Sequence, residues 1–116
     1  MFEEILHLNT NFTSLARKIA KKFELTLPQT LILFNISING TSMSALAHLL
    51  GLDPSTVTRN IEKLEIRNLL YRERSTNDTR MIYVYKSGDG ETIANKIEQE
   101  IEAVLNNAIN SKTNIK

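Results

Sequence analysis

The residues best suited to do chemistry lie between positions 53 and 66, where polar side chains recur on one side of a predicted helix. Val57, Ile61 and Leu64 follow one another at intervals of four and three residues, so we expect them to share a buried face. The opposite face carries Ser55, Thr56, Arg59, Asn60 and Lys63. We interpret this face as a row of hydrogen-bond donors that could enter a DNA major groove, where base edges offer acceptors. The alternative is an ordinary surface helix whose polar face meets water.

Local signals mark both ends of this helix. Asp53 can cap it by accepting a hydrogen bond from a free N–H of the first turn, and Pro54 suits the first helical position because it has no N–H to lose. Asn68 stands where a left-handed residue would end it. The sequence therefore predicts a helix that starts after residue 53 and ends near residue 67.

A shorter helix is predicted immediately before it. Thr41 or Ser42 can cap a helix over residues 43–50, and Gly51 stands where a left-handed residue would end that helix. The side chains expected to point inward are Leu46, Leu49 and Leu50. Two helices separated by a few residues with Gly in the turn are typical of a helix-turn-helix, although other short helical hairpins look similar.

A β-hairpin is predicted directly after this helix pair. Residues 69–74 and 81–85 have strand character, and the polar residues 75–80 between them form turns readily. A hairpin in this place would be the wing of a winged helix. Residues 53–86 carry seven Lys or Arg against five Asp or Glu, a local basic excess that matters only if the basic side chains face one way.

Long amphipathic helices are predicted at both ends of the chain. The first has an apolar stripe of Ile5, Leu8, Phe12, Leu15, Ile19 and Phe23. The last has a stripe of Ile93, Ile97, Ile101, Val104 or Leu105, and Ala108. Two such stripes predict self-association, whereas the alternative is a monomer in which both helices pack on the winged helix. The predicted dimer contacts are Ile5, Leu8, Phe12, Ile97, Ile101 and Leu105.

A second helix is predicted to restart at residues 25–29, with Pro28 at its first position, and to form the apolar centre of the fold through Leu31–Ile36. Arg17, Lys18, Lys21 and Lys22 precede it near the end of the first helix. We expect these cations to complement the helix dipole, with DNA contact as the alternative.

Composition restricts the function further. The chain has 116 residues and a net charge of +1, so overall charge does not argue for nucleic acid. It has no cysteine, which excludes disulfides and thiolate metal sites and is typical of a reducing cytosol. The sequence shows no apolar run long enough to span a membrane and no basic signal-peptide start, and we expect a cytoplasmic protein. The two histidines lack metal-ligand spacing and no Gly-rich phosphate loop is present, so we expect neither an enzyme, nor a metal site, nor a cofactor.

These features together resemble the MarR family of winged-helix transcription regulators. The resemblance is carried by residues 43–59 and 61–65, by Leu69-Leu70-Tyr71-Arg72, by Asp78-Thr79-Arg80, by residues 86–90 and by residues 25–29. It implies a mainly α fold with a small β-hairpin (α+β). The whole of residues 1–116 would be one winged-helix domain, with dimerisation helices at 1–24 and 88–110 around a core at 25–87.

The resemblance also implies roles for individual residues. It places Ser55, Thr56, Thr58, Arg59 and Lys63 at the major groove or its phosphates. Arg80 would reach from the wing into the minor groove while Asp78 holds its guanidinium, although the pair could equally be an ion pair that closes the hairpin.

Some positions depart from the family pattern. Asn68 replaces the usual Gly, and Thr79 stands where a basic residue is common. The C-terminal region has room for only one long helix, which puts in doubt the family's two-helix dimer element and the ligand pocket beside it. Without cysteine, sensing of oxidants through a thiol is excluded.

The sequence therefore predicts a homodimeric regulator that binds a pseudo-palindromic operator in double-stranded DNA, and the resemblance implies that it acts as a repressor. A small-molecule effector is left open. The alternatives are a winged helix that binds proteins and an architectural protein that binds DNA without sequence preference. An interaction module should carry aromatic anchors on the polar helix face, whereas Tyr71, Tyr83 and Tyr85 lie in the predicted strands.

Overall fold

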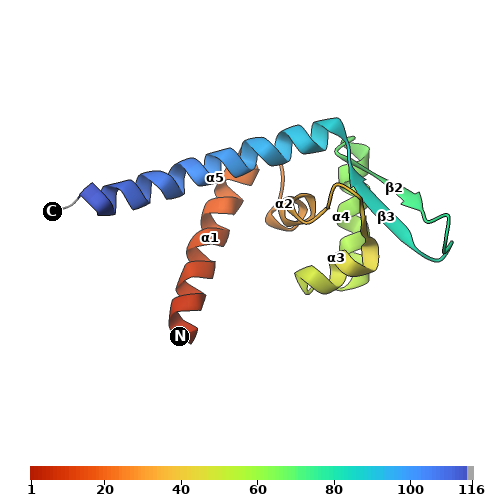
Figure 1. The fold of residues 1–116 in the computed structure, drawn as a ribbon, viewed down its shortest axis with the longest axis horizontal. Helices are drawn as coiled ribbons and strands as arrows, with labels where there is room; N and C mark the ends of the chain where they lie inside the picture. Colours follow the sequence, from red (N-terminus) through yellow and green to blue (C-terminus); the bar gives the residue numbers. More distant parts are fainter. Residues whose placement is uncertain (115–116) are drawn as a thin grey trace. The chain divides into compact units, whose positions relative to one another are not determined.

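The computed structural model describes residues 1–114, and the side chains of residues 1–108, as five helices and three strands (Figure 1). The elements in chain order are α1 (Phe2–Lys22), α2 (Leu27–Phe34), β1 (Thr41–Ser42), α3 (Met43–Leu50), α4 (Pro54–Ile66), β2 (Leu70–Arg74), β3 (Ile82–Lys86) and α5 (Gly88–Asn114). The predicted fold class, mainly helical with a wing, is confirmed.

The chain divides into two compact units. One consists of residues 28–94 and contains α3, α4 and the sheet; the other consists of residues 1–27 together with the chain from residue 95 onward. The first boundary falls between residues 27 and 28. The second falls inside α5, which also continues past the expected end at residue 110 to Asn114.

The helix-turn-helix of residues 43–66 forms from the local signals expected of it. The Ser42 hydroxyl accepts a hydrogen bond from the Ala45 N–H at 3.1 Å and so caps α3, and Gly51 ends α3 with a φ of +63°. Leu46 is fully buried, as expected. The expectation for Leu49 is wrong, because its side chain is 61% exposed on the outer side of the short helix.

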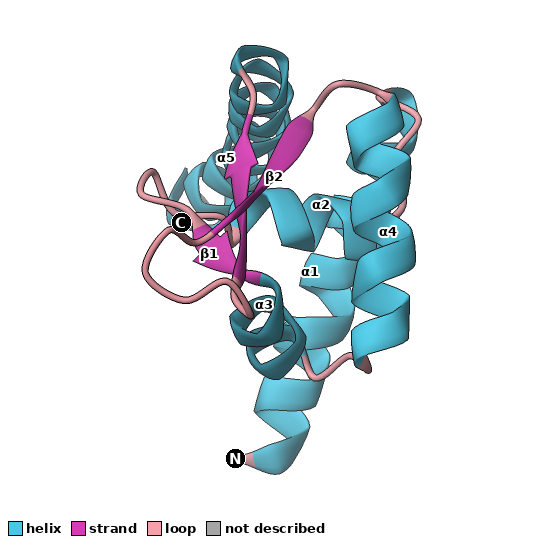
Figure 2. Ribbon diagram, turned by 90° about the vertical axis from the view of Figure 1, so that its right-hand side faces the viewer, coloured by secondary structure: helices cyan, strands magenta, loops and turns pink. Residues whose placement is uncertain are grey.

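The apolar face of α4 forms the centre of the winged-helix unit. Val57, Ile61 and Leu64 are all buried, as predicted, together with Ile32, Leu33 and Ile36 from α2 and the segment after it. Asn68 follows the helix with a φ of +60°, which confirms its left-handed conformation. α4 contacts both α3 and β2, so the helix-turn-helix and the wing share one core (Figure 2).

The sheet has three antiparallel strands in the order β1–β3–β2, rather than the two-stranded hairpin expected. β1 contains only Thr41 and Ser42, which pair with Val84 and Tyr83 of β3. So short a strand has no alternating pattern of its own, and it exists because β3 supplies its hydrogen-bonding partners.

The unit of residues 1–27 and 95–114 contains α1 and most of α5. Lys22 of α1 forms an ion pair with Glu100 of α5 at 2.9 Å. Ala16, Ile19 and Ala20 of α1 are buried, and so are Ile97 and Ile101 of α5. Among the described residues, no helix is both long and apolar enough to cross a membrane.

Candidate nucleic-acid interface

The polar face of α4 is open to solvent over most of its length. Ser55, Arg59 and Lys63 are exposed, while Thr56 and Thr58 are half-buried. Because Val57, Ile61 and Leu64 hold the opposite side in the core, these five side chains are carried on a rigid helix. The structure thus gathers all the predicted major-groove residues on one accessible surface.

Asp53 organises the first turn of this helix through hydroxyl groups. Its carboxylate accepts a hydrogen bond from the Thr56 hydroxyl at 2.7 Å and longer ones, at 3.3 Å to each oxygen, from the Ser55 hydroxyl. The expected cap bond from a backbone N–H does not reach regular hydrogen-bond geometry in this turn, although the Thr56 backbone N–H contributes to the lowered pKa of the Asp53 carboxyl. Asp53 still occupies the cap position, and Pro54 is the first helical residue as expected.

The same network reaches Arg59. The Arg59 guanidinium donates to the Thr56 hydroxyl oxygen at 3.3 Å, so Asp53, Thr56 and Arg59 form a continuous series of hydrogen bonds. The Thr56 hydroxyl is the largest cause of a lowered pKa for the Asp53 carboxyl, and the charge of Arg59 acts in the same direction. Asp53 is therefore ionised at neutral pH.

At the tip of the wing, Asp78 and Arg80 form a two-point ion pair. Arg80 Nε lies 3.1 Å from Asp78 Oδ1, and Arg80 Nη2 lies 3.3 Å from Asp78 Oδ2. The Arg80 backbone N–H also donates to Asp78 Oδ1, at 3.0 Å. The Arg80 side chain nevertheless remains 89% exposed, and its guanidinium is the first cause of a lowered pKa for the Asp78 carboxyl.

Short-range bonds shape the turn that carries this pair. The Ser75 hydroxyl accepts from the backbone N–H groups of Asn77 and Asp78, both at 3.2 Å. Arg74 donates to the carbonyl oxygen of Thr79, which fastens the strand to the tip. Arg74 was not among the predicted site residues, because only the folded turn brings that carbonyl within its reach.

A second unpredicted residue, Arg72, joins the wing to α4. Its Nη2 lies 2.8 Å from Glu65 Oε1, and both side chains are about 70% covered. The pairing of two residues seven positions apart on different elements has no local sequence signature. Its effect is to tie the wing to the helix that it follows.

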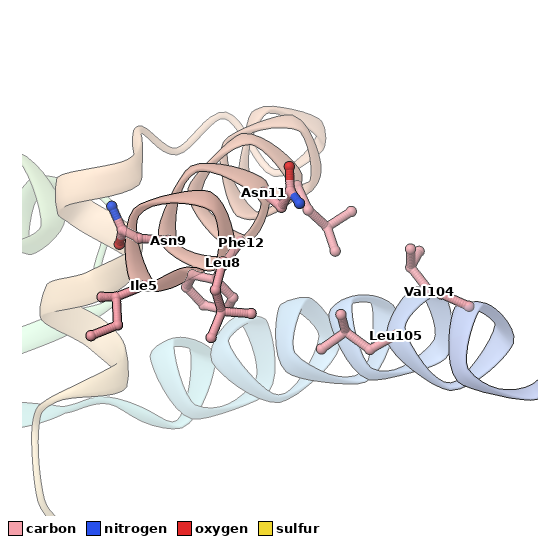
Figure 3. A pocket seen from close by; sticks show the side chains of 9 residues that line it. Ile5, Leu8, Asn9, Asn11, Phe12, Val104 and Leu105 are labelled. Atoms are coloured by element: carbon pink, nitrogen blue, oxygen red, sulfur yellow. The ribbon is translucent and has the colours of Figure 1, made fainter. Parts of the chain in front are cut away.

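The predicted dimer residues fall into two groups. Ile97 and Ile101 are buried within a single chain, so their side chains are already covered. Ile5, Leu8 and Leu105 are exposed, and Phe12 is half-buried. Leu8, Phe12 and Leu105 line an open apolar groove of about 860 Å³ between α1 and α5, together with Ile5, Asn9, Asn11, Leu15, Val104 and Ala108 (Figure 3).

A helix-turn-helix followed by a wing, with a polar recognition helix set on an apolar core, defines a winged-helix transcription regulator. Solved structures show the same fold: the chain superposes on apo MarR from E. coli with a TM-score of 0.86, at 19% identity over 97% of this chain and 83% of MarR. It also resembles S. aureus MepR F27L, solved bound to an oligodeoxyribonucleotide, with a TM-score of 0.77, at 16% identity over 95% of this chain and 83% of MepR. AbsC from Streptomyces coelicolor, a MarR family transcriptional regulator, superposes with a TM-score of 0.76, at 26% identity over 88% of this chain and 71% of AbsC, so the expected likeness to the MarR family is confirmed.

Residues 14–97 match the family described as transcriptional regulator SarA/Rot, and the chain belongs to that family. It is 34% identical over 79 residues to YhbI of Bacillus subtilis, an uncharacterized HTH-type transcriptional regulator. That match includes 67% of this chain and 51% of YhbI, so the chain spans about half the length of this relative. A family of transcriptional regulators agrees with the expectation that the chain is not an enzyme.

Proposed function

We propose that the chain is a homodimeric repressor that binds a pseudo-palindromic operator in double-stranded DNA. The observation that carries this proposal is the polar face of α4, where Arg59 and Lys63 stand exposed on a helix whose other face is fixed in the core. α4 would enter the major groove, and Arg80 would enter the adjacent minor groove. MepR, solved with DNA, offers a precedent at the level of fold.

Affinity and specificity would come from different residues. Lys63 would contact phosphate and contribute to binding at any sequence, because backbone contacts carry no sequence information. Ser55, Thr56 and Arg59 would contact base edges, and Thr58 would lie at the major groove or its phosphates. Arg80, a planar cation held by Asp78, suits the negative potential of a narrow minor groove.

The apolar groove of residues 1–27 and 95–114 supports the dimer. Leu8 is 71% exposed and Ile5 is 58% exposed on α1, while Val104 and Leu105 face the same groove from α5 (Figure 3). A second copy of this surface would cover these side chains and remove their apolar area from water. A two-fold dimer would then present two α4 helices, about 34 Å apart, to successive major grooves.

The repressor role follows most simply from operator occupancy, because a protein bound at a promoter blocks polymerase without further chemistry. A regulator of transcription acts where the chromosome lies, and we therefore place this protein in the cytoplasm.

A fluorescence anisotropy titration tests the proposal. The duplexes are the chain's own upstream region and a scrambled version of it, measured over a series of salt concentrations. Tight binding to the upstream duplex, a steep salt slope and a marked loss on the scrambled duplex are expected. Equal affinity for both duplexes would indicate an architectural role instead.

The second candidate is a winged helix that binds protein. One surface favours it: Tyr71 and Tyr85 stack with ring centroids 5.3 Å apart, and Tyr85, Ile38 and Ser37 line one small cavity there. Ile38 is 94% exposed, and exposed aromatic and aliphatic groups are typical anchors of interfaces. Absence of DNA binding even at low salt would favour this candidate.

A further inference from the structure

We infer that the hydroxyl groups of Ser55 and Thr56 on α4 present acceptors to DNA rather than donors, and that Asp53 imposes this polarity. Ser55 and Thr56 would then read the exocyclic amino groups of cytosine or adenine, while Arg59 reads guanine. This inference rests on the proposed operator binding and specifies the chemistry that α4 can recognise. It reverses our interpretation of the helix face as a row of donors.

The direction of each hydrogen bond follows from its partner. An ionised carboxylate carries no proton, so Asp53 only accepts, and the bonds at 2.7 Å from Thr56 and 3.3 Å from Ser55 use the hydroxyl protons. The Thr58 hydroxyl lies 2.9 Å from the Pro54 carbonyl oxygen, which also lacks a proton. All three hydroxyl groups therefore have their single donor engaged inside the protein.

What remains on the outer surface is a set of lone pairs. A hydroxyl has one donor and two acceptor sites, so Ser55 retains acceptor capacity after its proton is used. Thr56 also accepts from Arg59 at 3.3 Å, and this bond directs the guanidinium along the same surface. Arg59 and Lys63 are thus the side chains of the predicted site on α4 that have free donors.

Base edges in the major groove differ in whether they offer hydrogen-bond donors or acceptors, so acceptor-only hydroxyl groups can distinguish between bases. Cytosine N4 and adenine N6 offer donors there, whereas guanine O6 and N7 and thymine O4 offer acceptors. Hydroxyl groups that can only accept favour the amino groups of cytosine and adenine, and the Arg59 guanidinium favours guanine. Asp53 acts as a positioning residue, because it accepts the hydroxyl protons of Ser55 and Thr56 and so leaves only their acceptor sites for the bases.

The test compares wild type with Asp53→Gly. Glycine is well tolerated at a helix N-cap, so the helix start is preserved while the carboxylate is removed. Glu62→Ala is the matched control, because it removes an exposed carboxylate from the same helix without touching the hydroxyl groups. Circular dichroism melting verifies that each variant folds.

Each full-length protein first selects duplexes from a randomised library. Fluorescence anisotropy then compares its affinity for the selected duplex with its affinity for a duplex that lacks the exocyclic amino group at the contacted base. In that second duplex, 2-pyrimidinone replaces cytosine, or unsubstituted purine replaces adenine. Wild type and Glu62→Ala should lose about tenfold in affinity when the amino group is absent. Asp53→Gly should lose this discrimination and select guanine or thymine more often at that position. Thr56→Val removes one of the hydroxyl groups, so the base pair at which its preference changes is the one that Thr56 contacts. The same variant provides the test if Asp53→Gly does not fold.

The outcomes separate the two proposals. A wild-type protein that selects no sequence overturns operator binding and this inference with it. A wild-type protein that selects a sequence whose base preferences are unchanged in Asp53→Gly and Thr56→Val overturns only the inference.

Discussion

Glu65 of α4 and Arg72 of β2 meet at 2.8 Å, and this contact connects the recognition helix to the wing. Both side chains are more than two-thirds covered, which shields the pair from solvent better than the Asp78–Arg80 pair at the tip of the wing. If α4 and Arg80 act in neighbouring grooves, the angle between helix and wing must suit the duplex. The pair is well placed to hold that angle.

Arg72→Ala should lower the free energy of unfolding by about 1 kcal/mol, because it removes a partly covered ion pair and the packing of the arginine stem. Urea denaturation measures the loss. A double-mutant cycle with Glu65→Ala isolates the pairwise part, which should be about 0.5–1 kcal/mol. Additive single effects would show that the two residues do not cooperate.

Arg80→Ala should weaken operator binding about tenfold, because it removes the minor-groove cation. The Arg80 side chain is 89% exposed and its ion-pair partner is Asp78 on the same turn, so stability and oligomeric state should be unchanged. Unchanged anisotropy would show that the wing does not contact DNA as proposed.

The same pair has a pH signature. Arg80 lowers the pKa of Asp78, so the ion pair is intact above the ordinary aspartate pKa and is lost only as the pH falls through the lower folded value. NMR titration of the Asp78 carboxyl should give a midpoint below that of an unperturbed aspartate. In Arg80→Ala the midpoint should return toward the ordinary value.

Lys63→Ala should lower affinity by a similar factor on all sequences and flatten the slope of log affinity against log salt by about one unit. Lys96→Ala is the control, since it removes the same charge from an exposed residue of α5 outside the proposed contact surface. A loss confined to the selected operator would make Lys63 a base contact instead.

Leu8→Glu should shift the protein toward monomer, because it places a charge on an apolar surface that a second copy would cover. The expected cost to dimerisation is about 2 kcal/mol, measurable by sedimentation equilibrium. Ile38→Glu, at an even more exposed apolar residue of the other unit, should leave the dimer unchanged. Ile97→Glu is unsuitable for this purpose, because Ile97 is fully buried within one chain and the variant should unfold.

Gly90→Ala should destabilise the protein by about 3 kcal/mol, because a Cβ there would lie 1.8 Å from the backbone oxygen of Leu69. Gly88→Ala, two residues earlier in α5, meets no atom within 4 Å and should be neutral or slightly stabilising. Thermal unfolding of both variants measures the difference. Equal melting temperatures would contradict the close approach of the start of α5 to Leu69.

Features governed by bonds between near neighbours could be predicted from the sequence. The Ser42 cap, the left-handed Gly51 and Asn68, and the Ser87 hydroxyl that accepts from the Gly90 N–H all use partners within a few residues. The buried face of α4 was predictable for the same reason, because helical periodicity depends only on spacing along the chain. These local rules were enough to predict the winged helix and its polar recognition face.

Tertiary structure decided the features that depend on which groups meet in space. β1 exists because β3 pairs with it, and Arg72 meets Glu65 only after the wing folds back toward α4. The coverage of Ile97 and Ile101, which the sequence presented as part of an open stripe, likewise needs the folded chain. The polarity of Thr56 also depended on three-dimensional geometry. The sequence placed Asp53 three residues away, but only the side-chain rotamers determined that its carboxylate accepts the Thr56 hydroxyl proton.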